Sequence, residues 1–139
     1  MVDYARSLLG TPYEINLPGY PRQPGRGLGK RIPPDGGIDC SGYVLQCLNH
    51  VGVLTDLDPL FTSVVILSQR SEPLDAAETR PGDLVFFKDT YIAGLSHIGI
   101  VTEAGGQGFI DAREPEVSED AMNGYWALHF SHYGRPEGL

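Results

Sequence analysis

The chain has 139 residues, of which 41% are hydrophobic and 20% are charged, with 18 glycines and 11 prolines. This length fits a single domain over residues 1–139, and the apolar fraction excludes a disordered or fibrous chain. The net charge of −8 makes the chain a poor general binder of nucleic acid or of anionic membranes. No stretch of about 20 apolar residues could span a membrane. The first residues show no basic segment followed by an apolar run, so no signal peptide is visible.

The first part of the chain combines a short helix with a long loop. A helix is predicted over residues 3–9, because Gly10 and Pro12 end the pattern there. Residues 18–37 contain almost no apolar side chains and are dense in proline and glycine, which predicts a long loop, and loops of this length are usually functional or mobile. Four of the ten basic residues of the chain lie in this loop, namely Arg22, Arg26, Lys30 and Arg31. Charge is therefore segregated, with a basic loop set against an acidic remainder.

The following segments predict helices before strands. Residues 41–50 predict a helix because Val44, Leu45 and Leu48 recur at helical spacing, and residues 60–69 are a weaker helix candidate. Four later segments are rich in β-branched and aromatic residues and predict strands: 83–88, 97–103, 108–112 and 125–132. Helices followed by an antiparallel meander predict an α+β fold.

Cys40 is the candidate nucleophile. It stands where a glycine-rich segment meets the predicted helix, and the positive end of a helix macrodipole favours the thiolate. The alternative is a buried structural cysteine, an interpretation that fits Cys47 better because Cys47 lies in mid-helix between Leu45 and Leu48. About 10 Å of helix separates the two cysteines, so no disulfide between them is expected.

A nucleophilic cysteine needs a base, and His97 is the best candidate because it begins an apolar predicted strand. His50 lies about 15 Å from Cys40 along the same helix, which is too far to serve. His129 and His132 are three apart on a predicted strand and would face opposite sides, so a shared metal is not expected. The sequence has neither a C-x-x-C nor an H-E-x-x-H motif, and we expect no metal or organic cofactor.

Asp111 is the candidate for the group that orients the base. It lies on the strand predicted after that of His97, across a glycine-rich hairpin, and neighbouring antiparallel strands can place such a pair side by side. The alternative places Asp111 in an acidic surface run. The other members of that run would be Glu114, Glu116, Glu119 and Asp120. The residues by themselves favour neither interpretation.

Four segments together resemble the NlpC/P60 cysteine peptidases, in matching order and spacing over residues 4–133. They are ARSLLGTPY from residue 5, DCSGYV from residue 39, RPGDLVFF from residue 80 and SHIGIV from residue 96. The resemblance implies a papain-like α+β fold with N-terminal helices packed on a central antiparallel sheet. It also implies hydrolysis of peptide bonds in peptidoglycan stem peptides, often the bond between γ-D-glutamyl and the diamino acid.

The resemblance also implies roles for individual residues. Cys40 matches the nucleophile, and His97 matches the base. Tyr13 matches a tyrosine that lines the site near the nucleophile. Asp39 and Ser41 flank the cysteine and match a pair that helps to bind the free amine of the stem peptide.

Two departures from the family pattern concern the site. Asp111 stands where the family usually has His, Asn or Gln, but an aspartate can orient an imidazole and stabilise an imidazolium, so a Cys-His-Asp site is expected to be active. The loop of residues 18–37 replaces a short family segment. Its basic side chains could recognise the free carboxylates of stem peptides, because arginine forks pair with carboxylates. The alternative is a solvated loop whose charges only aid solubility.

Three functions are compatible with these residues. The first is a cell-wall endopeptidase, and the second is an amidase or acyltransferase that uses the same Cys-His pair. The third is a catalytically degenerate module that binds the wall or belongs to a phage tail. The presence of both Cys40 and His97 argues against this module, and the unusual third residue, Asp111, argues slightly for it. A wall hydrolase must reach the wall, so secreted, periplasmic and phage-delivered locations all stay open.

Overall fold

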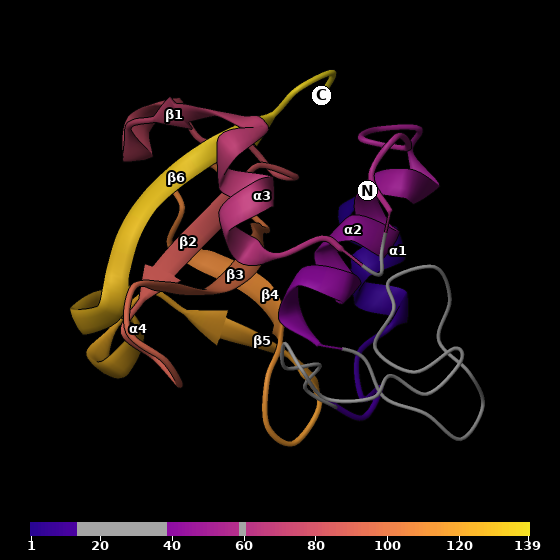
Figure 1. The fold of residues 1–139 in the computed structure, drawn as a ribbon. Helices are drawn as coiled ribbons and strands as arrows, with labels where there is room; N and C mark the ends of the chain where they lie inside the picture. Colours follow the sequence, from indigo (N-terminus) through magenta and orange to yellow (C-terminus); the bar gives the residue numbers. More distant parts are fainter. Residues whose placement is uncertain (14–38, 59–60) are drawn as a thin grey trace.

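Figure 1 shows the computed structural model, which describes residues 1–13, 39–58 and 61–139. At its centre is an antiparallel six-stranded sheet with the strand order β1-β6-β2-β3-β4-β5. The strands are β1 (Ser71–Leu74), β2 (Leu84–Lys88), β3 (Leu95–Val101), β4 (Gly108–Ala112), β5 (Val117–Ala121) and β6 (Phe130–Pro136). The helices are α1 (Val2–Ser7), α2 (Cys40–His50), α3 (Val64–Gln69) and α4 (Gly124–His129), with a short 3₁₀ turn, η1 (Ala76–Glu78). The predicted α+β class is confirmed.

The helix α2 positions the candidate nucleophile. The Asp39 carboxylate accepts a hydrogen bond of 2.7 Å from the backbone N–H of Gly42, and this bond caps the start of the helix. The apolar side of α2 packs on β3 and β4, and the Tyr43 hydroxyl donates to the carbonyl of Ala5 at 2.9 Å, which ties α1 to α2. The helix predicted over residues 41–50 is confirmed, and it begins at Cys40.

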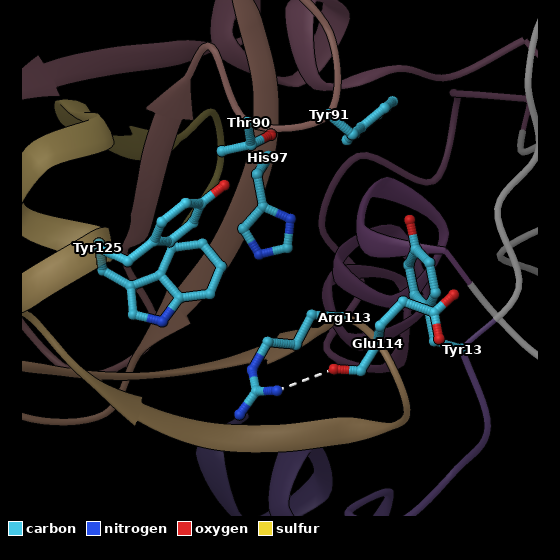
Figure 2. A pocket seen from close by; sticks show the side chains of 8 residues that line it. Tyr13, Thr90, Tyr91, His97, Arg113, Glu114 and Tyr125 are labelled. Carbon is cyan, nitrogen blue, oxygen red and sulfur yellow. Dashed lines mark hydrogen bonds between the residues drawn. The ribbon is translucent and has the colours of Figure 1, made fainter.

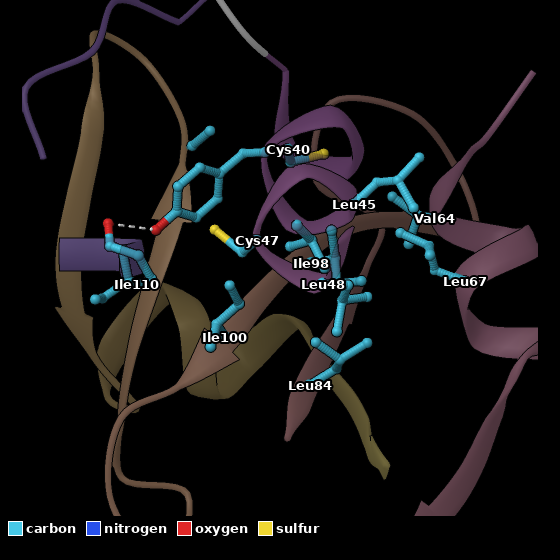
Figure 3. Close-up of a cluster of buried hydrophobic side chains, with 14 of the residues drawn as sticks. Cys40, Leu45, Cys47, Leu48, Val64, Leu67, Leu84, Ile98, Ile100 and Ile110 are labelled. Atoms are coloured by element: carbon cyan, nitrogen blue, oxygen red, sulfur yellow. Dashed lines mark hydrogen bonds between the residues drawn. The ribbon is translucent and has the colours of Figure 1, made fainter. Parts of the chain in front are cut away.

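The sheet has two different faces. The α2 face carries alternate side chains of β2, β3 and β4 that pack against α1, α2 and α3, as Figure 3 shows for Leu84, Ile98, Ile100 and Ile110. The α4 face carries the side chains between them, which pack with Trp126 of α4 and with Phe130. Its buried apolar residues are Val85, Phe87, Val101, Phe109 and Tyr133. Because strand side chains alternate, the register decides which residues reach each face.

Most predicted elements are present. The strands predicted over residues 83–88, 97–103 and 108–112 are β2, β3 and β4, and the helix predicted over residues 3–9 is α1. Of the helix predicted over residues 60–69, the described part is helical from Val64. None of the helices in the described part of the chain is long and apolar enough to cross a membrane.

The prediction of a strand over residues 125–132 is wrong for the first half of that segment. That segment forms the helix α4, and β6 begins only at Phe130. Its aromatic residues indicated a strand, but Trp126 packs from the helix onto Phe87 and Phe109. Tertiary packing therefore overrides the local preference. The two edge strands β1 and β5 were not predicted.

Candidate active site

Cys40 is the first residue of α2, and its side chain reaches β3. Only 3% of its surface is exposed, and its sulfur makes hydrogen bonds with the backbone of Ser41 and of Ile98. Since Ile98 directly follows His97, the start of α2 lies next to the candidate base. Burial raises the pKa of the Cys40 thiol, the Asp39 carboxylate raises it further, and the two backbone hydrogen bonds act in the opposite direction. The helix terminus was expected to favour the thiolate, and burial acts against that expectation.

His97 and Asp111 form a buried hydrogen-bonded pair. His97 Nε2 and Asp111 Oδ2 are 2.7 Å apart, and Asp111 has no exposed surface, so this carboxyl does not belong to an acidic surface run. The indole of Trp126 stacks on the imidazole with centroids 4.9 Å apart and an interplanar angle of 22°. Burial lowers the pKa of His97 to about 4 and raises the pKa of Asp111 well above its ordinary value.

Gly99 lets the two strands of this pair come close together. A Cβ atom at Gly99 would lie 2.8 Å from Cδ2 of Phe109 and 3.4 Å from Cβ of Asp111. The first distance is shorter than real Cβ contacts, so a side chain at this position would push β4 away from β3. The glycine thus leaves room for the Asp111 carboxyl to reach diagonally across to His97.

A pocket of about 240 Å³ opens beside His97 (Figure 2). Tyr13 lies on the side of it near α2, and the loop between β2 and β3 closes another side, where the Thr90 and Ser96 hydroxyls are 2.6 Å apart. The pocket is mainly aromatic, with one cation and one carboxylate among its lining side chains. The lining residues are Tyr13, Thr90, Tyr91, His97, Arg113, Glu114, Tyr125 and Trp126.

The other predicted site residues differ in where they lie relative to this pocket. Tyr13 lines the pocket, and its backbone N–H donates to the Pro115 carbonyl at 3.0 Å. Asp39 and Ser41 are both buried at the start of α2, where the Asp39 carboxylate caps the helix. The four basic residues of the predicted loop lie outside the described residues. They are Arg22, Arg26, Lys30 and Arg31.

The remaining histidines and cysteine have structural contacts. His50 stacks on Tyr4 with centroids 3.7 Å apart. His129 and His132 do not share a strand, contrary to the prediction: the first is in α4 and the second is in β6. Cys47 is a free, buried thiol in the α2 core. Within residues 1–13, 39–58 and 61–139, no group of three or more His, Cys, Asp or Glu side chains is arranged to hold a metal ion.

Among the residues that line the pocket, only Tyr13 and His97 were predicted as site residues, and the role of Asp120 was not predicted either. Arg113 holds the Asp120 carboxylate through two hydrogen bonds, of 2.7 and 3.0 Å, and Trp126 covers His97. The sequence offered two signals: Trp126 is the sole tryptophan, and Arg113 is a cation within an acidic segment. Neither signal shows that these side chains converge on His97, because that depends on the register of β5 and on the position of α4.

Known structures share this fold. An NLP/P60 family protein of Staphylococcus aureus, similar to a lipoprotein, superposes with a TM-score of 0.69 at 20% identity, over 97% of this chain and 39% of that one. A Bacillus cereus family protein gives a TM-score of 0.68 at 19% identity, over 97% and 38%. The chain thus spans less than half the length of both. RipD of Mycobacterium tuberculosis, a non-catalytic NlpC/p60 domain protein adapted to peptidoglycan binding, gives 0.66 at 15% identity, over 98% and 93%.

The sequence itself carries the family pattern. No curated protein sequence matches the chain. The NlpC/P60 family model, however, matches residues 24–135, a range that includes Cys40, His97 and Asp111. The same residues form the buried site described above, and the solved structures show the same fold. The chain therefore belongs to the NlpC/P60 family.

Proposed function

We propose that the chain is a cysteine endopeptidase that hydrolyses peptide bonds in peptidoglycan stem peptides, at the bond between γ-D-glutamyl and the diamino acid. The observation that carries the proposal is the buried hydrogen bond between His97 and Asp111, on the strand that Cys40 reaches from the start of α2. A cysteine, a histidine and an orienting acceptor are the groups that acyl transfer through a thioester requires.

The proposed reaction begins with a neutral Cys40 thiol and a neutral His97 imidazole. Nε2 of His97 carries the hydrogen that faces Asp111, so Nδ1 is the nitrogen that accepts the thiol proton of Cys40. Burial favours the neutral thiol and the neutral imidazole, and proton transfer therefore accompanies the attack of sulfur on the scissile carbonyl carbon. The collapse of the tetrahedral intermediate breaks the C–N bond, and Nδ1–H protonates the departing amine.

Hydrolysis then regenerates the site. His97 takes a proton from water, the hydroxide oxygen attacks the thioester carbon, and the sulfur leaves and recovers its proton from Nδ1. The backbone N–H of Cys40 is in the first turn of α2 and has no acceptor within the helix, so it can stabilise the oxyanion. A donor of this kind is worth roughly 3 kcal/mol of transition-state stabilisation.

The substrate would lie in the aromatic pocket beside His97. Tyr13 forms part of its wall. At the start of α2, Asp39 and Ser41 would receive the free amine of the stem peptide. The four basic residues at positions 22, 26, 30 and 31 would bind its carboxylates. Substitution of all four by serine should raise KM for wall fragments, and an unchanged KM would rule out this recognition role.

The test is mass spectrometry of purified peptidoglycan digested by the wild type, by Cys40→Ala and by Cys47→Ala. The proposal expects new free amine and carboxylate ends within the stem peptide for the wild type and for Cys47→Ala, and none for Cys40→Ala. Cys47→Ala is a matched control, because it removes a thiol from the same helix within the core. Release of the same products by Cys40→Ala would show that the nucleophile is assigned wrongly. A cleaved sugar–peptide amide or an acylated product would identify an amidase or an acyltransferase instead.

The similarity to RipD favours a second candidate, a module that binds peptidoglycan without cleaving it. By contrast, SagA, a peptidoglycan hydrolase, has an NlpC/p60 domain that superposes on this chain with a TM-score of 0.58 at 20% identity, over 96% of this chain and 93% of that one. A pull-down with insoluble peptidoglycan separates the two functions. Binding without products from the wild type would indicate the module, whereas products that depend on Cys40 would indicate the enzyme.

A further inference from the structure

Four polar side chains lie together on the α4 face of the sheet. In the register of β4 and β5, Phe109 is opposite Asp120 and Asp111 is opposite Ser118, so Asp120 is the diagonal neighbour of Asp111 on the same face. His97 reaches Asp111 from β3 on one side, and Arg113 follows β4 and holds Asp120 on the other. These contacts connect the imidazole, through the two carboxyls, with the Arg113 guanidinium. Figure 2 shows that Arg113 and His97 both line the pocket.

One oxygen of Asp111 has an unusual environment. Oδ2 bonds to His97, but the fully buried Oδ1 has no hydrogen-bond donor among the residues that the structure describes. The Asp120 carboxyl is nevertheless within hydrogen-bond contact of Asp111. Two ionised carboxylates only accept hydrogen bonds, so this contact is favourable only if the two groups share one proton.

The surroundings decide which carboxyl holds that proton. Asp111 has no exposed surface, whereas the Asp120 side chain is 13% exposed and receives two hydrogen bonds from Arg113. Burial raises the pKa of Asp111 well above its ordinary value, and the contact with Asp120 raises it further. Burial also acts to raise the pKa of Asp120, but the hydrogen bonds from Arg113 and with Asp111 bring it below its ordinary value.

We propose that Asp111 is a neutral carboxylic acid whose Oδ1–H donates to the Asp120 carboxylate, and that Asp120, fixed by Arg113, is a positioning residue for His97. The carbonyl oxygen Oδ2 then accepts from Nε2–H of His97 and holds the imidazole in the tautomer whose Nδ1 is free to take a proton. The part played in catalysis rests on the proposed function, whereas the position of the proton does not.

Several titratable groups surround this pair. His97 faces Asp111 from β3, Asp120 faces it from β5, and Arg113 lies beyond Asp120. From α2, Cys40 and Tyr43 face the same pair, since a charge on Asp111 would raise the pKa of each. A neutral Asp111 adds no charge to this set, so the single negative charge of the pair stays on Asp120, next to its cation. Low-dielectric surroundings favour this arrangement over two buried anions.

Infrared spectroscopy tests the position of the proton without any turnover. In Cys40→Ala at neutral pH, we expect a protonated-carboxyl C=O stretch that Asp111→Asn, made in the same background, removes. Glu119→Gln is the matched control, because it removes a carboxylate of β5 that pairs with Arg6 on the surface, and it should keep the band. The absence of a protonated-carboxyl band, or its persistence in Asp111→Asn, would overturn the proposal.

Kinetics test the positioning role. Asn at position 111 offers a carbonyl to His97 and an N–H to Asp120, so Asp111→Asn should keep kcat/KM within about tenfold; an ionised triad aspartate would lose on the order of 10⁴-fold. In Asp120→Asn, the amide N–H donates to Asp111, which then ionises and raises the pKa of His97. The apparent pKa on the acid side of the pH profile of kcat/KM should therefore rise by about one unit or more in Asp120→Asn. It should not change in Glu119→Gln. A loss of kcat/KM near 10⁴-fold in Asp111→Asn, or an unchanged acid-side pKa in Asp120→Asn, would refute the proposal. Activity in Cys40→Ala would refute only the proposed function.

Discussion

The two faces of the sheet bury different kinds of residue. The α2 face is mainly apolar, and Cys47 is packed there among Tyr43, Leu48 and their neighbours. The α4 face buries His97 and Asp111 beside Phe87 and Trp126. Burial of polar groups costs free energy unless they are hydrogen-bonded, so the second face depends on its internal contacts. The comparison indicates that the α2 face supplies most of the stability and carries Cys40, whereas the α4 face supplies the hydrogen-bonded pair of His97 and Asp111.

The largest effect should come from the α4 face and should be on activity. His97→Ala removes the base, and we expect kcat/KM to fall by 10²- to 10⁴-fold, on the order of what general-base catalysis contributes. His50→Ala is the matched control, because that ring is exposed and stacks only on Tyr4 among the aromatic rings described. Turnover measured on stem-peptide fragments checks the prediction. Equal losses in the two variants would contradict the division between the faces.

The next effect should come from the α2 face and should be on stability. Leu48 has no exposed surface and packs in the core between α2 and the sheet. Leu48→Ala should lower the free energy of unfolding by about 2–5 kcal/mol, because it leaves a cavity. Leu48→Met keeps the volume and should cost less than about 1.5 kcal/mol. Urea unfolding measures both values, and the folded fraction of Leu48→Ala should keep its kcat/KM. A specific loss of activity would show that the faces are more closely coupled than we infer.

A smaller effect concerns pH and connects burial with catalysis. Burial lowers the pKa of His97 to about 4, so the imidazole stays unprotonated, and able to act as a base, to lower pH than an ordinary histidine. We expect kcat/KM to fall only as the pH drops through about 4. Trp126→Ala exposes the imidazole of His97. It should therefore move the acid-side fall of kcat/KM towards the ordinary histidine pKa of about 6.5. If kcat/KM of the wild type already falls near pH 6.5, burial does not lower the pKa of His97.

The smallest effect concerns Asp39, at the start of α2. Asp39→Ala removes the cap on Gly42 and should cost about 1 kcal/mol of unfolding free energy, whereas Asp39→Asn keeps a good cap. Asp39→Asn also removes a charge that raises the pKa of Cys40, so alkylation of this thiol by iodoacetamide should be faster at a given pH. Asp3→Asn makes the same change of charge in α1 and serves as the control. Equal alkylation rates in Asp39→Asn and the wild type would show that this charge does not act on the thiol.

The elements that the sequence predicted well share one property, a strong local pattern. The apolar spacing of Val44, Leu45 and Leu48 predicts α2, and the segment GFIDA predicts β4 within the correct bounds. Both elements are buried against the core, so their apolar periodicity follows directly from their position. The pairing of His97 with Asp111 was one of the two interpretations that the sequence allowed, because a hairpin joins their strands.

The elements that were missed have weak local patterns for a physical reason. Both β1, with the sequence SEPL, and β5, with the sequence VSEDA, lie at the edges of the sheet, where one side of the strand has no neighbour. Edge strands tolerate proline and charged residues, and these residues hide the strand pattern. Asp120 lies in β5, so its contact with Asp111 could not be read from an acidic run that resembles a solvated surface.

The sequence by itself determined the family, the α+β class, the cysteine at a helix start and the order of the candidate residues, because these depend on local spacing and motifs. Only the tertiary structure decided that Cys40, His97 and Asp111 are buried, and that burial shifts their pKa values against ionisation. It also decided that an edge strand brings Asp120 and its arginine to the site. Desolvation and strand register arise from contacts between distant segments, and no local pattern in the chain encodes them.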